Sequence, residues 1–433
     1  MSPTFSSLRI RNYRVYVIGS LISNIGTWMQ NTAQAWLVLV LTGSGTALGV
    51  TVALQLLPTL LLSPAGGVIA DRFPKRTVLR IMQVMMAVPA AALGVLAVTG
   101  VVQTWHVYLI AFIFGIGRAL EAPARQSFVA EMVGRDDLGN AVALNSASFN
   151  SGRLIGPGVA GLLIAAFGAG VVGTGWVILI NAVSYAAAYI ALQLIDTARL
   201  RPTPLLTARR GAIREGIRYV RSRPDLVLIL WCVFFLGGFG MNFQITSALM
   251  ATEEFGKGAS EYGVLGSILA VGSLVGSLLA ARRPVPRLRF IVLAGLCFSA
   301  LQITSGLMPT FVTYAAILPL VGLCILTMAT TANAMIQLTS APVMRGRVAA
   351  LYLMVFIGSV PFGAPLTGWI GEEFGARAAV VSTGAIAGLG IMVVSVWYQV
   401  RFKAQRKRLR TTVRDLRSKY VARASIRGFR TPQ

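Results

Sequence analysis

The chain has 433 residues, of which 55% are hydrophobic and only 12% are charged, and its formal net charge is +25. A soluble domain has about 25% charged residues, so a water-facing surface over most of this chain is excluded. Backbone groups in lipid must pair internally, which leaves helices or a closed barrel. Stretches such as LQLLPTLLLSPAGGVIA (residues 54–70) lack the alternation of barrel strands, so helices are favoured.

Twelve apolar segments follow one another along the chain, each close to the length of about 20 residues that spans a bilayer. They are residues 13–41, 47–70, 77–99, 102–122, 140–167, 173–195, 226–252, 262–281, 290–308, 311–338, 348–371 and 377–400. Turn sequences such as LTGSG, FGAG and GEEFG separate them. The sequence therefore predicts an all-α integral membrane protein with twelve transmembrane helices.

The positive charges are distributed unevenly about these segments. With the N-terminus inside, all but three of the 39 lysines and arginines fall at the same side of the membrane, the exceptions being Lys257, Arg377 and Arg153. This is the positive-inside pattern, and it places both termini in the cytoplasm of a cell inner-membrane protein. The basic composition is thus mostly a topology signal, and no nucleic-acid partner is expected.

The long basic loop near the middle divides the chain into two sets of six predicted spans. The expected units are a bundle at 1–195, a cytoplasmic linker at 196–225, a bundle at 226–400 and a basic tail at 401–433. GPGVAGLLIAAFG (residues 156–168) aligns with GAPLTGWIGEEFG (363–375) at a constant offset, in the fifth span of each half. Two matched halves related by an axis along the membrane normal are a transporter plan.

A cluster of charged residues lies between the second and third predicted spans, in the segment GVIADRFPKRTVL (residues 67–79). It resembles the signature loop of the major facilitator superfamily, although Pro74 stands where that family has glycine. The resemblance implies a latch that holds the cytoplasmic ends of the two bundles together. Its expected residues are Gly67, Asp71, Arg72, Lys75, Arg76 and Arg118. From the residues alone, a positive-inside loop with an incidental acid is the alternative.

Longer stretches narrow the resemblance. NIGTWMQNTAQAWLVLVLTGS (residues 24–44), residues 118–161 and REGIRYVRSRPDL (214–226) resemble the macrolide-efflux and enterobactin-exporter branch of the drug:proton antiporters. GRLIGPGVAG (152–161) resembles the antiporter motif of the fifth span, carried by Gly152, Gly156, Pro157 and Gly161, with Ala160 departing from it. The family implies proton antiport and export. Plain helix packing is the alternative explanation of the glycines.

Arg153 lies within the fifth predicted span, where a charge costs about 2.5–3.5 kcal/mol. It is expected to face the interior, with Glu121 as a possible partner. The alternative is an arginine near the cytoplasmic end whose head group reaches the membrane surface.

Polar residues recur at helical spacing in several predicted spans, including Asn24, Thr27, Asn31 and Gln34 at intervals of 3, 4 and 3. They predict either interhelical hydrogen bonds or a wide amphipathic cavity for a bulky, partly apolar cargo. The expected cavity residues are Asn24, Trp28, Asn31, Gln34, Asn145, Arg153, Asn242, Gln244, Asn333 and Gln337.

Proton coupling normally needs a buried acid, and no acid is predicted at mid-membrane. Glu121, expected at the cytoplasmic end of the fourth span, is the candidate. The three cysteines lie in apolar blocks without metal-ligand spacing, so neither a cofactor nor a metal is expected.

The tail places Leu409, Val413, Leu416 and Tyr420 on one apolar stripe of an otherwise basic helix. It predicts a helix on the anionic inner leaflet, with a solvated disordered tail as the alternative.

The sequence favours a secondary-active exporter of small amphipathic molecules that works as a monomer by alternating access. A lysolipid flippase or an uptake carrier on the same fold is the second hypothesis. A membrane enzyme or a receptor is the third hypothesis. The enzyme lacks support because no nucleotide-binding or hydrolase motif is present, and the receptor because no soluble domain of sufficient length is expected.

Overall fold

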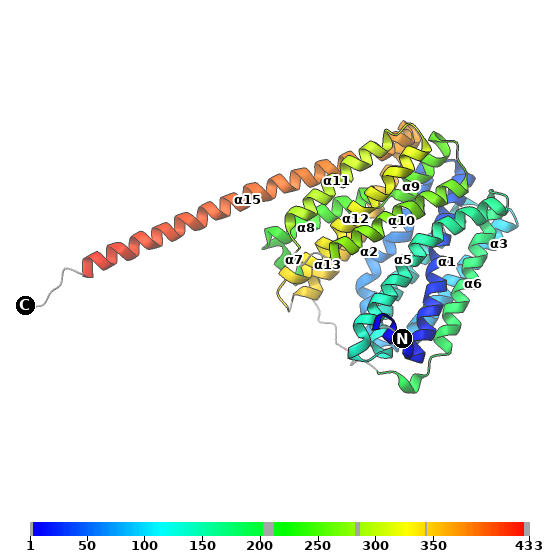
Figure 1. The fold of residues 1–433 in the computed structure, drawn as a ribbon, viewed down its shortest axis with the longest axis horizontal. Coiled ribbons are helices and arrows are strands. Elements are labelled where there is room, and N and C mark those ends of the chain that lie inside the picture. Colours follow the sequence, from blue (N-terminus) through cyan, green and yellow to red (C-terminus); the bar gives the residue numbers. More distant parts are fainter. Residues whose placement is uncertain (1–2, 202–211, 282–285, 343, 428–433) are drawn as a thin grey trace, which may run out of the picture.

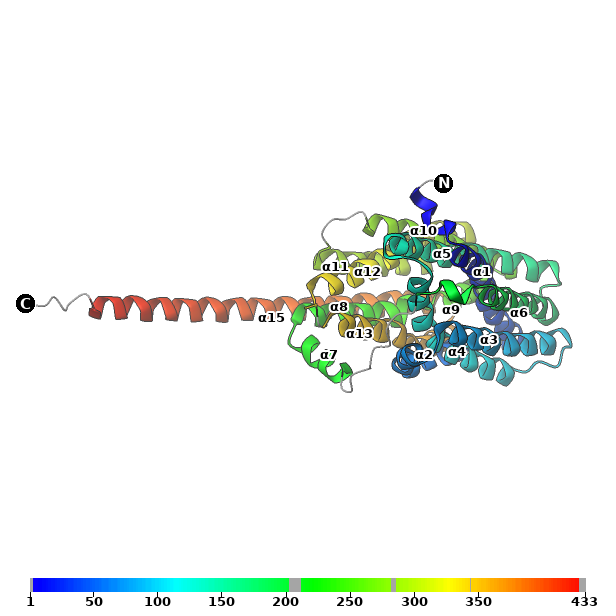
Figure 2. The same ribbon diagram turned by 90° about the horizontal axis from the view of Figure 1, so that it is seen from below.

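The computed structural model describes the chain apart from residues 1–2, 202–211, 282–285, 343 and 428–433. In the described part all regular secondary structure is helical. Two helical bundles lie side by side, and one long helix leaves the second bundle (Figures 1 and 2). The predicted all-α membrane fold is confirmed.

The first bundle contains six long helices. They are α1 (Arg11–Thr42), α2 (Gly45–Arg72), α3 (Lys75–Val98), α4 (Thr104–Met132), α5 (Arg135–Ala166) and α6 (Val171–Gln193), preceded by the short η1 (Pro3–Arg9). The short η2 (Thr197–Arg199) and α7 (Ala212–Arg221) follow in the predicted linker. Gly43, at φ 60°, ends α1, and the Ser44 side chain accepts a hydrogen bond from Ala47 N to begin α2.

The second bundle also contains six spans, but two of them are broken. The seventh span consists of α8 (Pro224–Phe235), the π-helical η3 (Leu236–Gly240), α9 (Phe243–Leu249) and the π-helical η4 (Met250–Glu254). The eleventh consists of α13 (Arg345–Gly358) and α14 (Val360–Phe374). The others are α10 (Ala259–Ala281), α11 (Leu288–Gly306), α12 (Phe311–Thr339) and α15 (Ala376–Arg427). The sequence predicted these two broken spans as single helices.

Ten of the twelve spans are long and apolar enough to cross a membrane on composition alone. The two that fall short, α1 and α5, have 32 residues each, so each is about 48 Å long and more than spans the bilayer. Their polar side chains lower the mean hydropathy, and several of these side chains are buried against neighbouring helices.

The two breaks pack against each other. The backbone of η3 approaches the α13–α14 junction so closely that a Cβ on Gly237 would overlap the Phe356 carbonyl oxygen. Nearby, Asn242 Nδ2 donates to Thr367 Oγ1 at 3.0 Å and to the Gly238 carbonyl. The glycines of LGGFG thus permit a contact between broken helices that a regular helix would not make.

The fourth span is longer than the sequence predicted. It continues to Met132 instead of ending at residue 122. Arg118, Glu121 and Arg125, which the sequence placed on the cytoplasmic side, therefore lie within α4. Glu121 is eleven residues before its end, about 16 Å along the helix. The run of charges was mistaken for the end of the span.

Two equivalent contacts form the interface between the halves. Helix α2 of the first half packs on α14 of the second, and α5 of the first half packs on α10 of the second. A Cβ on Gly161 would overlap the Ala259 carbonyl oxygen at the start of α10, and one on Gly368 would overlap the Gly45 carbonyl oxygen at the start of α2. Gly161 and Gly368 occupy matching positions in the aligned segments. The repeat in the sequence therefore corresponds to matching backbone contacts in the fold.

The interface is closed at one end of the molecule, which we call the far end, where α1 meets α2 and α14 meets α15. There Trp36 stacks on Tyr262 with ring centroids 5.9 Å apart. Glu372 of α14 accepts hydrogen bonds from Ser44 Oγ at 2.6 Å and from Thr46 N at 3.0 Å. These bonds place a carboxylate at the N-terminus of α2 from the opposite half, where the helix dipole favours negative charge.

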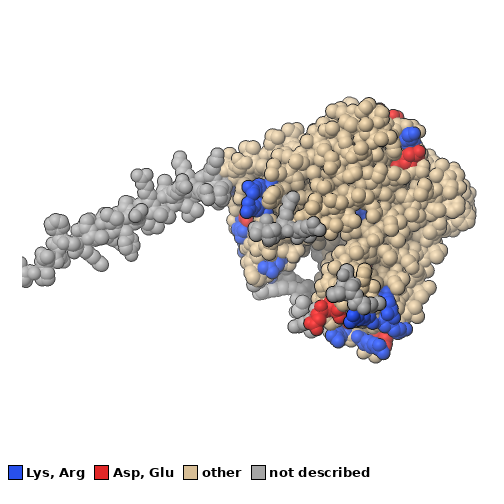
Figure 3. Space-filling view, viewed as in Figure 1, with Lys and Arg blue, Asp and Glu red and all other residues tan. Residues whose placement is uncertain are grey.

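The opposite end, which we call the basic end, carries lysine and arginine side chains on two rims with a gap between them (Figure 3). One rim belongs to each half, and the N-terminus lies at this end (Figure 1). The conformation is therefore closed at the far end and open at the basic end.

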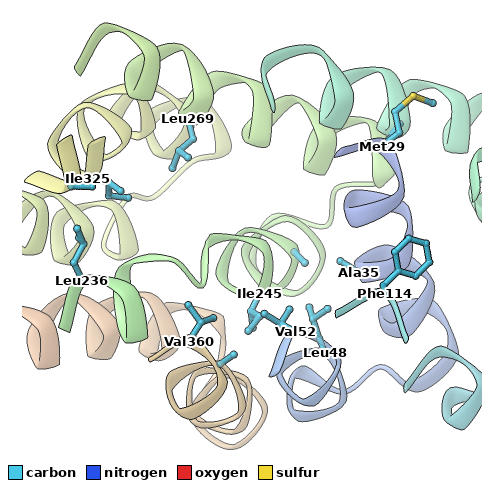
Figure 4. Packing of buried hydrophobic residues seen from close by; sticks show 14 of the residues in the cluster. Met29, Ala35, Leu48, Val52, Phe114, Leu236, Ile245, Leu269, Ile325 and Val360 are labelled. Carbon is cyan, nitrogen blue, oxygen red and sulfur yellow. The ribbon is translucent and has the colours of Figure 1, made fainter. Parts of the chain in front are cut away.

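Apolar side chains seal the closed part of the interface. Leu48 and Val52 of α2 lie beside Ile245 of α9, with Val360 of α14 close by (Figure 4), and all four are buried.

The last helix, α15, runs without a break from Ala376 to Arg427. It continues the twelfth span beyond the bundle (Figure 1). The side chains after Arg401 lie outside the described residues, including the stripe of Leu409, Val413, Leu416 and Tyr420, so contact of the tail with the inner leaflet stays a prediction.

We predict that Glu372→Gln weakens the closure of the far end, because a neutral amide interacts less favourably with the α2 N-terminus. A loss of about 0.3–1 kcal/mol corresponds to a two- to five-fold shift toward separation. Spin labels at the exposed positions Val172 and Phe374, one in each half, would report longer distances by double electron–electron resonance. Glu373→Gln, the same change one residue away, is the control, and an equal response of both variants would contradict the assignment.

Candidate functional site

The basic residues of the signature loop make contacts within the first bundle. Lys75 is buried and its Nζ lies 2.6 Å from Glu131 Oε1 of α4, so two charges pair in a site with little water. Arg76 donates to the carbonyl oxygens of Leu192 and Gln193 at 2.7 and 2.8 Å. These bonds supply donors to carbonyl oxygens at the C-terminal end of α6 that have no partner within the helix. The loop thus ties together the basic ends of α3, α4 and α6.

The remaining predicted latch residues are placed differently. Arg72 is exposed, and the side chain of Asp71 lies outside the described residues. Gly67 has open space where a Cβ would stand, whereas Gly66 packs on the Ala119 carbonyl, so Gly66 and not Gly67 permits a close helix contact in this conformation. Arg118 lies inside α4, about 21 Å along the helix from its Met132 end.

The antiporter-like motif uses two faces of α5. Gly152 and Gly156 pack on α1, where added Cβ atoms would meet the backbone of Asn24 and the side chain of Trp28. Pro157 and Gly161 pack on α10 of the opposite half. At 100° per residue, positions four apart share a face and the two pairs lie on different faces. The motif therefore joins α5 both to its own half and to the other half.

The polar residues of α1 mostly bond to neighbouring helices. Asn24 donates to Ser148 Oγ of α5 at 3.0 Å, and Asn31 accepts from Gln55 of α2 at 3.0 Å. Gln34 is buried, with no hydrogen-bond partner for Oε1 among the described residues. For Asn24 and Asn31 the interhelical alternative fits better than an open cavity wall. The buried side-chain oxygen of Asn145 on α5 likewise has no hydrogen-bond partner in the described part of the chain.

Of the predicted cavity residues in the second half, one bonds to a neighbouring helix, and the others bond to no other helix that the structure describes. Asn242 is buried and tied to α14, as described above, while Gln244 is half-buried. Asn333 and Gln337 form a pair within α12, with Gln337 Nε2 donating to Asn333 Oδ1 at 3.2 Å. Gln337 is exposed and lies two residues before the basic end of its helix.

Arg153 faces an aromatic ring and not an acid. Its guanidinium carbon lies 5.9 Å from the centroid of the Trp28 ring, and Trp28 in turn contacts Phe149 edge to face at 5.8 Å. The described residues place no carboxylate within 4.0 Å of it, so the expected pairing with Glu121 is not formed. Arg153 is eighteen residues from the start of α5, about 27 Å, which also excludes a position near the basic end.

Glu121 instead faces a small polar pocket within the first bundle, between α1, α3, α4 and α6. Gln83 Nε2 donates to Glu121 Oε1 at 3.3 Å, and Arg125 donates to Asn24 Oδ1 at 3.3 Å across the same pocket. Tyr16 lines its wall, and its hydroxyl has no described hydrogen-bond partner. Tyr16 and Gln83 could not be assigned to this pocket from the sequence because they lie on α1 and α3, whereas Arg125 is four residues from Glu121 on α4 and was predicted to lie outside the span.

Cys232 and Cys324 are buried and Cys297 is exposed, all as free thiols. No cluster of metal-ligating side chains occurs among the residues for which the structure gives positions.

Two six-helix halves around a seam that is open at one end define a membrane transporter of the major facilitator class. A family model described as a transmembrane secretion effector matches residues 2–420. The chain belongs to this family of major facilitator transporters, which are not enzymes.

Curated relatives of this chain are also transporters. The chain is 27% identical to the multidrug efflux pump Tap of Mycolicibacterium fortuitum, covering 84% of this chain and 90% of the relative. It is 24% identical to the staphyloferrin A transporter of Staphylococcus aureus (91% and 97% covered) and to the enterobactin exporter EntS of Shigella boydii (76% and 77% covered). The predicted branch of the superfamily is confirmed.

Solved structures share the fold. A bacterial homologue of the lysosomal transporter Spinster, inward-facing and unoccupied, has a TM-score of 0.69 at 14% identity, covering 92% of this chain and 97% of that one. A bacterial homologue of the iron transporter ferroportin scores 0.69 in its inward-facing state at 14% identity (90% and 98% covered). The same homologue scores 0.58 in its outward-facing state at 15% identity (90% and 99% covered).

We predict that Gly161→Ala separates α5 from α10, because the added methyl group would overlap backbone that cannot move aside. Spin labels across the far end would then show a larger separated population and transport would slow. Gly139→Ala, on the same helix but with open space around it, is the matched control. Equal behaviour of the two variants would contradict a role for Gly161 in the interface.

We also predict that Lys75→Gln destabilises the first bundle, because the buried Glu131 carboxylate would lose the ammonium group that lies 2.6 Å from it. Breaking such a pair costs about 3–5 kcal/mol, so the thermal unfolding temperature of purified protein in detergent should fall clearly. The double change with Glu131→Gln should recover much of the loss, and Arg72→Gln, an exposed neighbour, should have little effect. A full loss in the double variant would show that the charge pair is not the cause.

Proposed function

We propose that the protein is a secondary-active exporter of small amphipathic molecules and that it couples export to protons by antiport. The observation that carries the proposal is the seam between the halves, closed at one end and open at the other. A site on such a seam is reached from one side at a time. The family and the efflux relatives support export over uptake.

In this proposal the basic end faces the cytoplasm of a cell inner-membrane protein. The two arginine-bearing rims support this orientation by the positive-inside rule. The conformation is then inward-open, and the higher TM-score with the inward-facing ferroportin homologue agrees with it. The signature loop would complete its latch in the opposite state, when the rims meet. The proposed units remain 1–195, 196–225, 226–400 and 401–433, acting as a monomer.

Glu121 is the proposed proton carrier. It lies inside α4 beside Arg118 and Arg125, at positions three and four residues away on the same face of the helix. Its pocket holds polar side chains that could bond either protonation state, and an acid within a membrane helix is functional by default. Movement of the halves would change the access of this pocket to water.

A lysolipid flippase or an uptake carrier is the second proposal, because the same fold and open seam would serve either. Lipid movement without dye movement would favour the flippase.

The test uses proteoliposomes, an imposed pH gradient and a panel of anionic, neutral and cationic fluorescent dyes plus a fluorescent lysolipid. With one proton per cycle, a gradient of one pH unit supports roughly tenfold accumulation of at least one dye. Glu121→Gln should abolish the accumulation while downhill movement remains, and Asp71→Asn should slow both. Glu373→Gln is the control.

Gradient-driven accumulation that survives in Glu121→Gln would exclude Glu121 as the carrier, although export itself would stand. Failure of wild-type protein to accumulate any dye would contradict the antiport proposal.

A further inference from the structure

Arg153 is the charged side chain that neither the signature loop nor the proton pocket explains. It lies about 27 Å from the start of α5 and about 20 Å from its end. Charges this deep in a membrane protein are retained for a function and face the interior or a water-filled cavity. Its role depends on what faces it.

Few charges approach Arg153 from the helices packed on α5. Beyond their first turns, α1, α6 and α10 carry no charged residue. Before its last turn, α4 carries Arg118 together with Glu121 and Arg125, the two that line the separate pocket. In the described residues the guanidinium makes no ion pair and no hydrogen bond to protein. The Trp28 ring at 5.9 Å is its recorded partner. A cation–π contact leaves the guanidinium N–H groups available.

The position of Arg153 on the helix indicates where those groups point. Ser146, Asn150 and Arg153 are spaced 4 and 3 residues apart and form one polar stripe. The opposite face carries the exposed apolar residues Ile155 and Leu162, which suit lipid. At 100° per residue the stripe lies between the Gly152 and Gly161 faces, and so between α1 and α10. That direction is the seam between the halves.

The aromatic neighbours add a second kind of surface. Trp28 is half-buried, and Phe149 stands edge-on to it with 36% of its surface exposed. A flat apolar group can lie against these rings while an attached oxyanion accepts bonds from the guanidinium. Arginine presents several N–H donors in a planar fork that matches a carboxylate.

We infer that Arg153 and Trp28 form a subsite for amphipathic anions, in which the guanidinium binds an oxyanion of the cargo and the indole packs on its apolar ring system. The inference rests on the proposed function and deepens it by naming a substrate class. A cationic molecule of the same shape meets a positive charge in a site of low dielectric and is disfavoured.

The test compares two dyes with the same three-ring core and opposite charge, fluorescein and rhodamine 123, by fluorescence anisotropy with purified protein at pH 8. Wild-type protein should bind fluorescein at least tenfold more tightly. Loss of charge-assisted hydrogen bonds predicts that Arg153→Gln weakens fluorescein about 10- to 100-fold, while rhodamine 123 binds equally well or better. Arg153→Lys should be intermediate, and Trp28→Leu should weaken both dyes.

Arg289→Gln removes the same charge at an exposed position at the start of α11 and should change neither affinity. Thermal unfolding of each variant establishes that it is folded, and Arg153→Lys and Trp28→Leu keep the test valid if Arg153→Gln does not fold. A competition experiment distinguishes a cargo anion from a lipid headgroup as the ligand of Arg153. Phosphatidylglycerol, an anionic lipid, is added to the micelles, and phosphatidylcholine is its control. Strong competition by phosphatidylglycerol alone would assign the site to lipid and overturn the inference.

Equal loss of both dyes in Arg153→Gln, or no loss of fluorescein, would overturn the inference. Transport of rhodamine 123 but not fluorescein in the proteoliposome panel would also overturn it while leaving export intact. If neither these dyes nor any other dye of the panel is moved, the proposed function fails with it.

Discussion

The lack of water in the bilayer is the constraint on which this structure depends. A polar group in a spanning helix must find its partner in the protein or face a cavity. Asn24 and Asn31 bond to neighbouring helices, and Asn242 of the seventh span bonds to Thr367 of the eleventh. Lys75 and Glu131 pair at the basic end. These partners fix which helices are neighbours, and with them the shape of each half.

The contact between the two halves differs from the contacts within each half. In the proposed mechanism these surfaces separate in each cycle, so they cannot depend on many buried polar bonds. Backbone packing at small residues supplies the contact instead, at Gly161 on α10 and at Gly368 on α2. Few hydrogen bonds are lost when surfaces packed in this way separate. The Glu372 carboxylate at the N-terminus of α2 adds a charge-assisted contact that only the closed far end makes.

Charge inside the membrane is concentrated in two places with different surroundings. Glu121 lies among polar groups in a pocket of the first bundle, whereas Arg153 lies against the Trp28 ring. The first arrangement suits a group that gains and loses a proton, and the second suits a fixed charge that meets a ligand. In the proposed mechanism, cargo and proton thus occupy separate sites, and the movement of the two halves is what connects them.

The sequence by itself determined the class of the fold, because apolar length and the positions of arginine and lysine respond to the bilayer residue by residue. It also identified the signature loop, the glycine motif and Arg153, since each stands out locally from the apolar sequence around it. It could not find the end of α4, because Arg118, Glu121 and Arg125 imitate a polar loop unless their partners are known. Nor did it predict the π-helical turn at η3, which has no clear local signal, or the junction of α13 and α14, although Pro361 cannot donate a helical backbone hydrogen bond there. Whether an amide such as Asn31 bonds a neighbour or lines a cavity, and whether Arg153 meets Glu121 or Trp28, was decided by tertiary structure alone, since helical spacing fixes the face on which a side chain stands but not what lies opposite it.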